Sequence, residues 1–178
     1  MIKYAITDPS FFNPTNLNNF NRYKDIDFVL FRDKSASCYA QVANAFIQNA
    51  KEFNFKPMIH QDYILAKQLG AFGVHLNSKQ SIAIKRAKEL GLYVVISTHT
   101  KDEIKDAIKE GADAVTFSPI FETPNKGKPK GIEALKEVVD DFGKEIKIIA
   151  LGGIVTNKHI KEIELAKAWG FASIRYFK

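Results

Sequence analysis

The sequence predicts a compact (β/α)8 barrel, the TIM-barrel architecture, formed by residues 1–178 as a single domain and lacking the last helix. Eight short apolar runs recur along the chain, with a helical pattern in most of the intervals between them. Strands that alternate with helices pair in parallel, because each crossover helix returns the chain to the start of the sheet. Eight such units favour a closed barrel over an open doubly wound sheet, which is the alternative.

The first four strands are predicted at residues 4–7, 27–32, 57–59 and 73–76. The segment 11–23 is rich in asparagine and only weakly periodic, so it predicts a short helix at most. Residues 37–53 repeat apolar side chains at three- and four-residue steps, which is the pattern of an amphipathic helix. A shorter helix is predicted at 63–69, and Gly70 ends it.

The last four strands are predicted at residues 93–97, 114–117, 147–151 and 172–175. The helices of this half are predicted from Ser78 to residue 90, then at 100–110, 132–142 and 156–167. Ser78 and Thr156 are the expected N-caps of the first and last of these helices. Thr100 and Glu103 have the spacing of a capping box.

Without an eighth helix, the outer side of the strands near both termini is expected to lack a helical cover. Either a partner subunit of a homodimer covers that side, or the barrel is distorted there. The sequence predicts one of these two outcomes.

The composition is that of an ordinary globular domain, with 46% apolar and 26% charged residues. The formal net charge is +6, and the basic residues are scattered except for a cluster at Lys126, Lys128 and Lys130. Scattered charges usually form a solvated surface, and attraction of phosphorylated small molecules is the next interpretation. The sequence has no arginine-rich stripe, so no nucleic-acid partner is expected.

Cys38 is the only cysteine, so no internal disulfide is expected. No membrane association is expected either, because no apolar stretch is long enough to span a bilayer, and the expected location is the cytoplasm.

In a strand–helix barrel, functional groups lie at the C-terminal ends of the strands. In contrast to the strand starts, the predicted strand ends carry polar or basic side chains and one glycine pair. The side chains are those of Arg32, Lys34, His60, Ser97, His99, Ser118, Ser173 and Arg175, and the pair is Gly152 and Gly153. This asymmetry predicts a small-molecule site at one end of the barrel.

The strongest signal for an anion site is the segment 111–131. There a short apolar strand opens into a long loop that contains Thr123, Asn125 and Lys126. A fixed strand roots such a loop, and hydroxyl, amide and ammonium groups supply hydrogen-bond donors to phosphate.

Two further features predict phosphate binding, each with a structural alternative. The Gly152-Gly153 turn precedes a helix, where backbone N–H groups suit a phosphate, although a tight turn alone would also explain it. Arg32 and Lys34 point to one side if their strand continues, and with Lys126 they would hold a polyanion. Surface charge is the alternative for these three residues.

The histidines are less specific signals. His75 follows an apolar run and is better interpreted as buried and hydrogen-bonded than as a base. His99 is equally consistent with a surface position and with a functional one. His60 stands beside Gln61 and Asp62, but without the spacing of metal ligands this is only a weak metal signal.

In combination, the motifs of nearly the whole chain resemble the thiamine phosphate synthase/TenI family. The matching segments, in chain order, are Tyr-Ala-Ile-Thr-Asp from Tyr4, Phe-Arg-Asp-Lys from Phe31, Gly-Val-His-Leu from Gly73, Ser-Thr-His-Thr from Ser97, Gly-Ala-Asp from Gly111, Ser-Pro-Ile-Phe-Glu-Thr from Ser118 with Lys126, and Ala-Leu-Gly-Gly-Ile from Ala150.

The resemblance implies a (β/α)8 barrel that couples hydroxymethylpyrimidine diphosphate to thiazole phosphate and releases diphosphate. It assigns the diphosphate to Arg32, Lys34, Thr123 and Lys126. Ser97 would lie on the pyrimidine and diphosphate side, and Gly152 and Gly153 would hold the thiazole phosphate. The expected partners are phosphorylated thiamine precursors or thiamine phosphate.

The chain also departs from the family pattern. The family implies Mg²⁺ as cofactor, but its two metal carboxylates fall on Gln61 and Gln80, so no metal-binding residue is predicted. Asp62 would need a shift of one residue to replace the first carboxylate. A family serine falls on Arg175, which would either clamp a phosphate or fill its pocket.

Coupling is therefore the leading prediction, and two alternatives remain open. One is a TenI-like thiazole tautomerase, an isomerase without metal that would use His60 or His99 as its base. The other is a non-catalytic thiamine phosphate binder.

Overall fold

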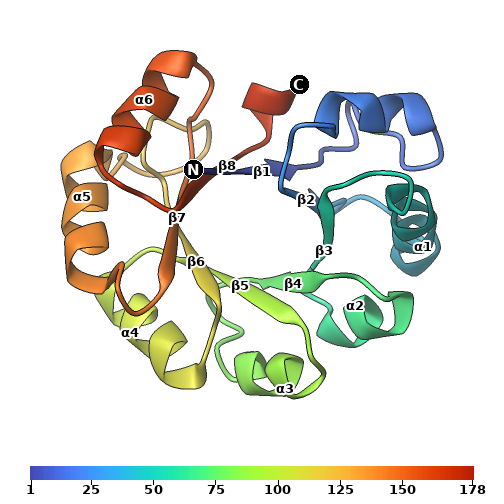
Figure 1. Ribbon diagram of the computed structural model, residues 1–178, viewed down its shortest axis with the longest axis horizontal. Helices are drawn as coiled ribbons and strands as arrows, with labels where there is room; N and C mark the ends of the chain where they lie inside the picture. Colours follow the sequence, from blue (N-terminus) through green and yellow to red (C-terminus); the bar gives the residue numbers. More distant parts are fainter.

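A computed structural model describes residues 1–178, and its eight parallel strands close into one barrel in the order of the sequence (Figure 1). The strands are β1 (Ile2–Ile6), β2 (Phe28–Phe31), β3 (Lys56–His60), β4 (Gly73–Leu76), β5 (Tyr93–Thr98), β6 (Ala114–Phe117), β7 (Lys147–Leu151) and β8 (Gly170–Ser173). Pairing of β1 with β8, from Ile2 opposite Gly170 to Ala5 opposite Ser173, completes the ring. The predicted barrel is confirmed, and the open sheet is excluded.

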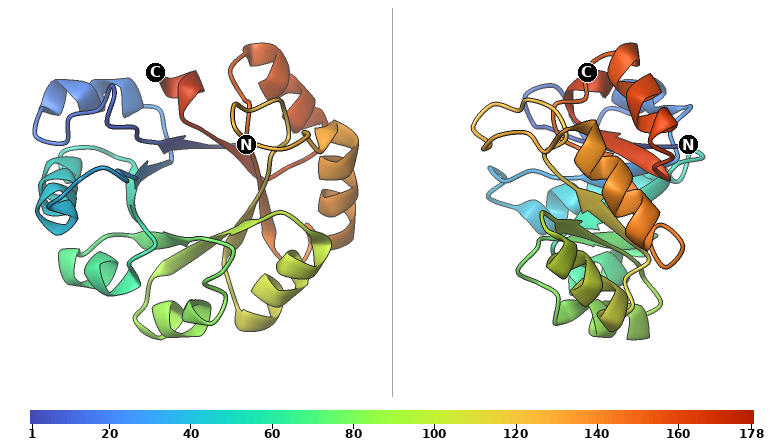
Figure 2. Two further views of the ribbon diagram at one scale, coloured as in Figure 1. Left: turned by 180° about the vertical axis from the view of Figure 1, so that it is seen from behind. Right: turned by 90° about the vertical axis from the view of Figure 1, so that its left-hand side faces the viewer.

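Helices ring the strands, as the view from behind shows (Figure 2). They are the 3₁₀ helix η1 (Leu17–Tyr23), α1 (Tyr39–Ala50), α2 (Tyr63–Leu69), α3 (Ala83–Glu89), α4 (Lys101–Glu110), α5 (Gly131–Phe142), α6 (Asn157–Leu165) and the final 3₁₀ helix η2 (Arg175–Phe177). Within residues 1–178, the helix that follows β8 is the short η2. No helix combines the length and the apolar character needed to cross a membrane.

Local hydrogen bonds account for most of the element boundaries. The capping box is present, because Thr100 Oγ1 accepts a bond from the N–H of Glu103 and the Glu103 carboxylate accepts one from the N–H of Thr100, both at 3.2 Å. Thr156 caps α6 as predicted. Segment 11–23 contains no α-helix: its second half is the 3₁₀ helix η1, which Asn16 caps by accepting a bond from the N–H of Asn18 at 2.9 Å.

Two predicted boundaries are wrong. Ser78 is not an N-cap: α3 begins only at Ala83, and Asn77 Oδ1 binds the N–H of Lys79, which shapes residues 77–80 into a turn. The eighth strand ends at Ser173 rather than at Arg175, which opens η2.

Aromatic rings close the N-terminal end of the barrel. Phe28, Phe72, Tyr93 and Trp169 pack together, with the Phe28 and Tyr93 ring centroids 5.6 Å apart. Lys56 Nζ lies over the Phe72 ring at 4.7 Å, and Lys147 Nζ lies over the Trp169 ring at the same distance. Trp169 is thus a packing residue at this end of the barrel.

The strands near the termini are not left uncovered, which corrects that expectation. Tyr176 and Phe177 of η2 pack on Phe171 of β8, with ring centroids 5.5 Å and 5.7 Å from it. In the segment after β1, Phe12 packs edge-to-face on Phe46 of α1, and Phe20 stacks on the same ring. The barrel is also undistorted at its closure, so a homodimer stays a prediction that the fold does not require.

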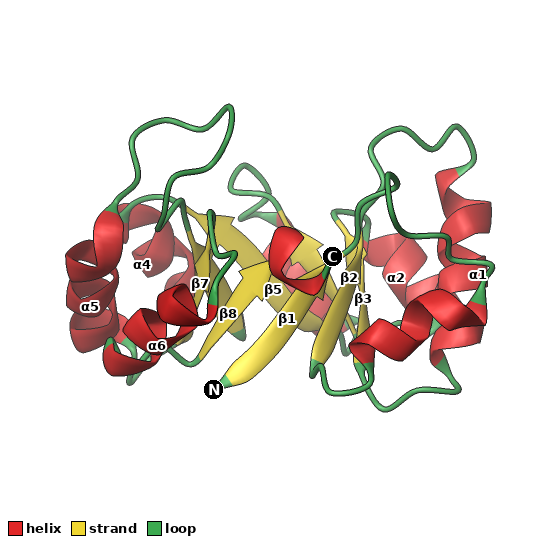
Figure 3. Ribbon diagram, turned by 90° about the horizontal axis from the view of Figure 1, so that it is seen from above, coloured by secondary structure: helices red, strands yellow, loops and turns green.

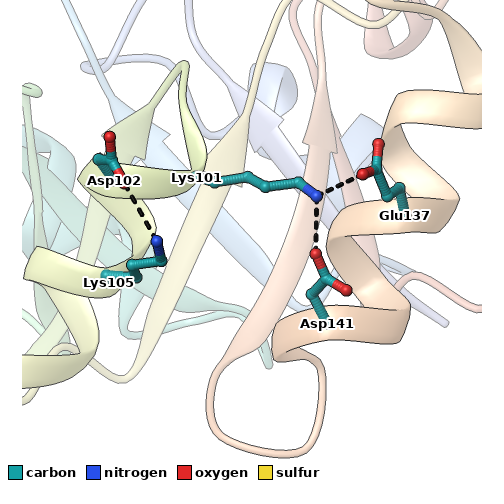
Figure 4. Close-up of polar contacts among 5 residues, drawn as sticks. All are labelled: Lys101, Asp102, Lys105, Glu137 and Asp141. Atoms are coloured by element: carbon teal, nitrogen blue, oxygen red, sulfur yellow. Dashed lines mark hydrogen bonds and ion pairs between the residues drawn. The ribbon is translucent and has the colours of Figure 1, made fainter.

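An ion-pair network joins α4 to α5 (Figure 4). Lys101 donates hydrogen bonds to Asp141, at 2.7 Å, and to Glu137, and these bonds raise the pKa of Lys101. The pair Lys105–Asp102, at 3.2 Å, lies within α4 and is exposed. Such exposed pairs add little stability, but the Lys101 pairs join the two helices that flank the long loop after β6.

Candidate functional site

The residues predicted to bind or react lie at the C-terminal ends of strands or in the segments that follow them, so they share one end of the barrel. In side view, the loops that follow the strands rise on the same side, and the highest of them precedes α5 (Figure 3). The side panel of Figure 2 shows this loop standing away from the barrel.

A cleft of about 970 Å³ lies between that loop and the ends of β7 and β8. The residues that line it are Phe121, Glu122, Thr123, Pro124, Asn125, Lys126, Gly127, Lys128, Pro129, Gly153, Val155, His159 and Arg175. Five residues of the predicted phosphate set therefore meet here: Thr123, Asn125, Lys126, Gly153 and Arg175. Three cationic side chains face a single carboxylate, so the cleft has the charge that suits a phosphorylated ligand.

The Gly152-Gly153 turn is built against the root of the loop. Both residues have positive φ, +101° and +69°, and a Cβ on Gly153 would lie 2.5 Å from the Glu122 carbonyl oxygen and 2.6 Å from the carbonyl carbon of Phe121. The N–H of Phe121 donates to Gly152 O at 3.0 Å, which fastens the loop to the turn. The N–H groups of both glycines donate to no acceptor in the chain. Gly153 lines the cleft and Gly152 adjoins it, and unpaired donors on a turn beside a cationic cleft favour an anion.

His159 was not predicted, although it lines the cleft. Its ring stacks on Phe121 with centroids 4.1 Å apart and planes 14° apart. Its Nδ1 accepts a bond from the N–H of Val155 at 3.3 Å, so the neutral ring carries its proton on Nε2. No sequence signal marks it, because a lone histidine in the first turn of a helix matches no motif.

Two predicted phosphate ligands have their hydroxyl protons engaged within the chain. Ser173 Oγ donates to Ile154 O at 2.7 Å and accepts from the N–H of Tyr176 at 3.1 Å, so it braces η2 against the segment after β7. Thr123 Oγ1 donates to Phe121 O at 3.0 Å. In this arrangement both hydroxyls hold the walls of the cleft.

A second group lies at the ends of β2 and β3. Burial, and then the charges of Arg32 and Lys34, lower the pKa of His60 to about 4. His60 is therefore neutral near pH 7, and the two basic side chains are close enough to act on it. Arg32 is fixed by Thr7, whose Oγ1 accepts from the N–H of Arg32 at 2.9 Å. Arg32, Lys34 and His60 line no part of the cleft.

The interior end of the site holds the other polar residues. His75 is 3% exposed, and its ring contacts Tyr4 and Ser97, so the prediction of a buried, hydrogen-bonded histidine is confirmed. His99 Nδ1 lies 3.0 Å from the Ser118 carbonyl oxygen. The Ser118 hydroxyl lies farther from Nδ1, at 3.3 Å, and the carbonyl can only accept, so we assign the proton of the neutral ring to Nδ1, which leaves Nε2 without a bond in the chain.

The positions that correspond to metal carboxylates do not fit Mg²⁺. Gln80 uses both ends of its amide inside the chain: Oε1 accepts from the N–H of Asn77 at 3.0 Å, and Nε2 donates to Gln61 O at 3.2 Å. Asp62 Oδ1 caps α2 by accepting from the N–H of Leu65 at 2.8 Å. No group of three or more His, Cys, Asp or Glu side chains is arranged to hold a metal ion. The side-chain amide of Gln80 thus links the segments after β3 and β4, where the carboxylates of a Mg²⁺ site would have to lie.

The packing of Gly153 makes a testable prediction about stability. Gly153→Ala should lower the free energy of unfolding by about 2–3 kcal/mol, because its Cβ would meet backbone atoms at a positive φ. Denaturant unfolding measures this change. The matched control is Gly127→Ala in the loop after β6, on the other wall of the cleft, where a Cβ meets open space and φ is not left-handed. Equal effects of the two changes would contradict the tight packing of the turn.

Comparison with known proteins places the chain in a family. The family model described as "Thiamine monophosphate synthase" matches residues 3–177. A protein of Aquifex aeolicus (strain VF5), named "Putative thiamine-phosphate synthase 2", is 32% identical over 98% of this chain and 96% of its own length. The thiamine-phosphate synthase of Anoxybacillus flavithermus (strain DSM 21510 / WK1) is 30% identical over 84% of this chain and 72% of its own length.

Among solved structures, a thiamine phosphate pyrophosphorylase from Pyrococcus furiosus superposes with a TM-score of 0.82 at 23% identity. The match covers 97% of this chain and 85% of the other, and it supports the fold. Together with the family match over nearly the whole length, these findings show that the chain belongs to the thiamine monophosphate synthase/TenI family.

Proposed function

We propose that this chain couples hydroxymethylpyrimidine diphosphate to thiazole phosphate, forming thiamine phosphate and releasing diphosphate. The observation that carries the proposal is the cationic cleft, which Gly153 lines, together with the unpaired N–H groups of the Gly152-Gly153 turn. A preformed pair of backbone donors beside basic side chains suits one phosphate group. Family membership supplies the identity of the phosphorylated partners.

The thiazole phosphate would bind at the Gly152-Gly153 turn. Arg175 reaches the same cleft from η2, and Lys126 and Asn125 reach it from the loop. The Nε2–H of His159 adds a further donor on the α6 side. In this proposal Thr123 and Ser173 hold the cleft walls, and Arg175 clamps the phosphate rather than filling its pocket.

The diphosphate would bind at the ends of β2 and β3, where Arg32 and Lys34 supply positive charge. The C–O bond to diphosphate breaks, and its electron pair leaves with the diphosphate. The lone pair of the thiazole nitrogen then forms the new C–N bond to the pyrimidine methylene carbon. Fixed cationic groups stabilise the leaving group, and a site closed to water protects the pyrimidine cation. Ser118 and Ser97 lie deeper, on the pyrimidine side.

Because Gln61 and Gln80 replace the metal carboxylates, the leaving group is stabilised here by side-chain cations. Thiamine phosphate should therefore form from both precursors in EDTA as well as in Mg²⁺. Quantifying the product under both conditions tests this expectation.

If thiamine phosphate forms only with Mg²⁺, the proposal that side-chain cations stabilise the leaving group without metal is wrong. If thiamine phosphate binds and no product forms under either condition, the chain is a binder and the coupling proposal is wrong.

Arg175 should be a direct phosphate contact. Arg175→Gln is expected to weaken thiamine phosphate binding about tenfold or more, because a hydrogen bond between charged groups contributes ~1.5–3 kcal/mol. Titration calorimetry measures the affinity. Arg22→Gln is the matched control, since Arg22 lies over Phe11 and does not line the cleft. An unchanged affinity of the Arg175 variant would show that the arginine only fills space.

A thiazole tautomerase is the second candidate, and the free Nε2 of His99 is the observation that favours it. His60 is the weaker base of the two candidates, because a histidine with a pKa near 4 accepts protons poorly at neutral pH. Interconversion of thiazole phosphate isomers without metal should then fall about 10²–10⁴-fold in His99→Asn. His60→Asn serves as the comparison and should retain most of the tautomerisation rate. If His60→Asn lowered the rate more than His99→Asn, His99 would be excluded as the base.

A further inference from the structure

A hydrogen-bonded line of three side chains crosses the inside of the barrel. Tyr4 Oη of β1 lies 3.0 Å from Nδ1 of His75 on β4, and His75 Nε2 lies 3.0 Å from Ser97 Oγ on β5. Tyr4 is fully buried and His75 nearly so, whereas Ser97 is only partly buried. The line therefore runs from the sealed interior to the open end of the site.

Burial determines where the protons of this line sit. It lowers the pKa of His75 to about 3, so the ring is neutral and carries a single N–H. Tyr4 Oη has no hydrogen-bond partner other than His75. If Nδ1 carried the proton, the Tyr4 O–H would have no acceptor, and leaving a buried donor unpaired costs about 1–3 kcal/mol. The Tyr4 hydroxyl therefore donates to Nδ1, and the ring proton sits on Nε2.

This arrangement also fixes the direction of the Ser97 hydroxyl. Ser97 Oγ accepts the Nε2–H bond, so its own proton must point elsewhere. Its neighbour across the ladder, Thr116, has a buried hydroxyl without any hydrogen-bond partner, so it does not take that proton. The Ser97 O–H is left free to donate into the site.

We propose that Tyr4 is a positioning residue: it holds His75 in the Nε2–H tautomer and thereby makes Ser97 an obligatory donor to the bound ligand. Ser97 then selects an acceptor atom of that ligand, such as a phosphate oxygen or a ring nitrogen, and disfavours a donor at the same place. The identity of the ligand rests on the proposed function. The tautomer does not.

Nitrogen-15 NMR of the histidine rings tests the tautomer in the whole protein without ligand. The expected spectrum of the native chain shows His75 protonated at Nε2 and bare at Nδ1, and Tyr4→Phe should give a mixture of tautomers. A proton on Nδ1 in the native chain, or an unchanged tautomer in Tyr4→Phe, would overturn the proposal. Tyr23→Phe is the matched control: Tyr23 is also fully buried, but its hydroxyl has no partner, so the His75 signals should not change.

Calorimetry with thiamine phosphate tests the consequence for binding. Ser97→Ala and Tyr4→Phe should each weaken binding about five- to tenfold, the effect of one lost hydrogen bond. The double variant should be no weaker than Ser97→Ala alone, since both changes act through the same donor. Additive losses would overturn the coupling between the two residues. If the native chain binds no thiamine phosphate, the proposed function fails, and the NMR result still decides the role of Tyr4.

Discussion

The pairing of β1 with β8 is the constraint on which the rest of the molecule depends. It requires close backbone approach: a Cβ on Gly170 would lie 2.2 Å from Ile2 Cγ1 and 2.9 Å from Ile2 O, so only glycine fits. Closure places Tyr4 inside the barrel, where it reaches His75 from β4. It also carries the chain after β8 to the cleft, where Arg175 faces the loop that follows β6. A short final helix is sufficient because η2 covers Phe171.

The two halves of the site differ in how far their donors are already committed. On the side of β6 to β8, the Gly152 and Gly153 N–H groups are unpaired, and Gly153 lines a cleft together with three basic side chains, so a phosphate would satisfy groups that the fold leaves open. On the side of β3 and β4, Gln80 spends its amide on holding two loops together. The β6–β8 side therefore has unpaired donors for an anion, whereas on the β3–β4 side the Gln80 amide is already hydrogen-bonded and no carboxylate pair is available.

The sequence predicts the fold well because its signals are local and periodic. Apolar runs mark the strands, and capping residues such as Thr100 and Thr156 mark helix starts through bonds within one turn. The site is predicted less completely, because its details depend on contacts between distant segments. No pattern places His159 against Phe121, and none shows that the Ser173 hydroxyl is already used by Ile154. Ser78 fails as a cap for a local reason instead: the Asn77 side chain binds the N–H of Lys79 and forms a competing turn.

The central claim is that phosphorylated thiamine compounds bind with their phosphate on the Gly152-Gly153 turn. Amide NMR during titration with thiamine phosphate tests it most directly, since each N–H reports on its own hydrogen bond. The account predicts that the signals of Gly152 and Gly153 shift most and saturate together with those of the loop around Lys126. Saturable shifts confined to other parts of the barrel, with these two amides unmoved, would contradict it.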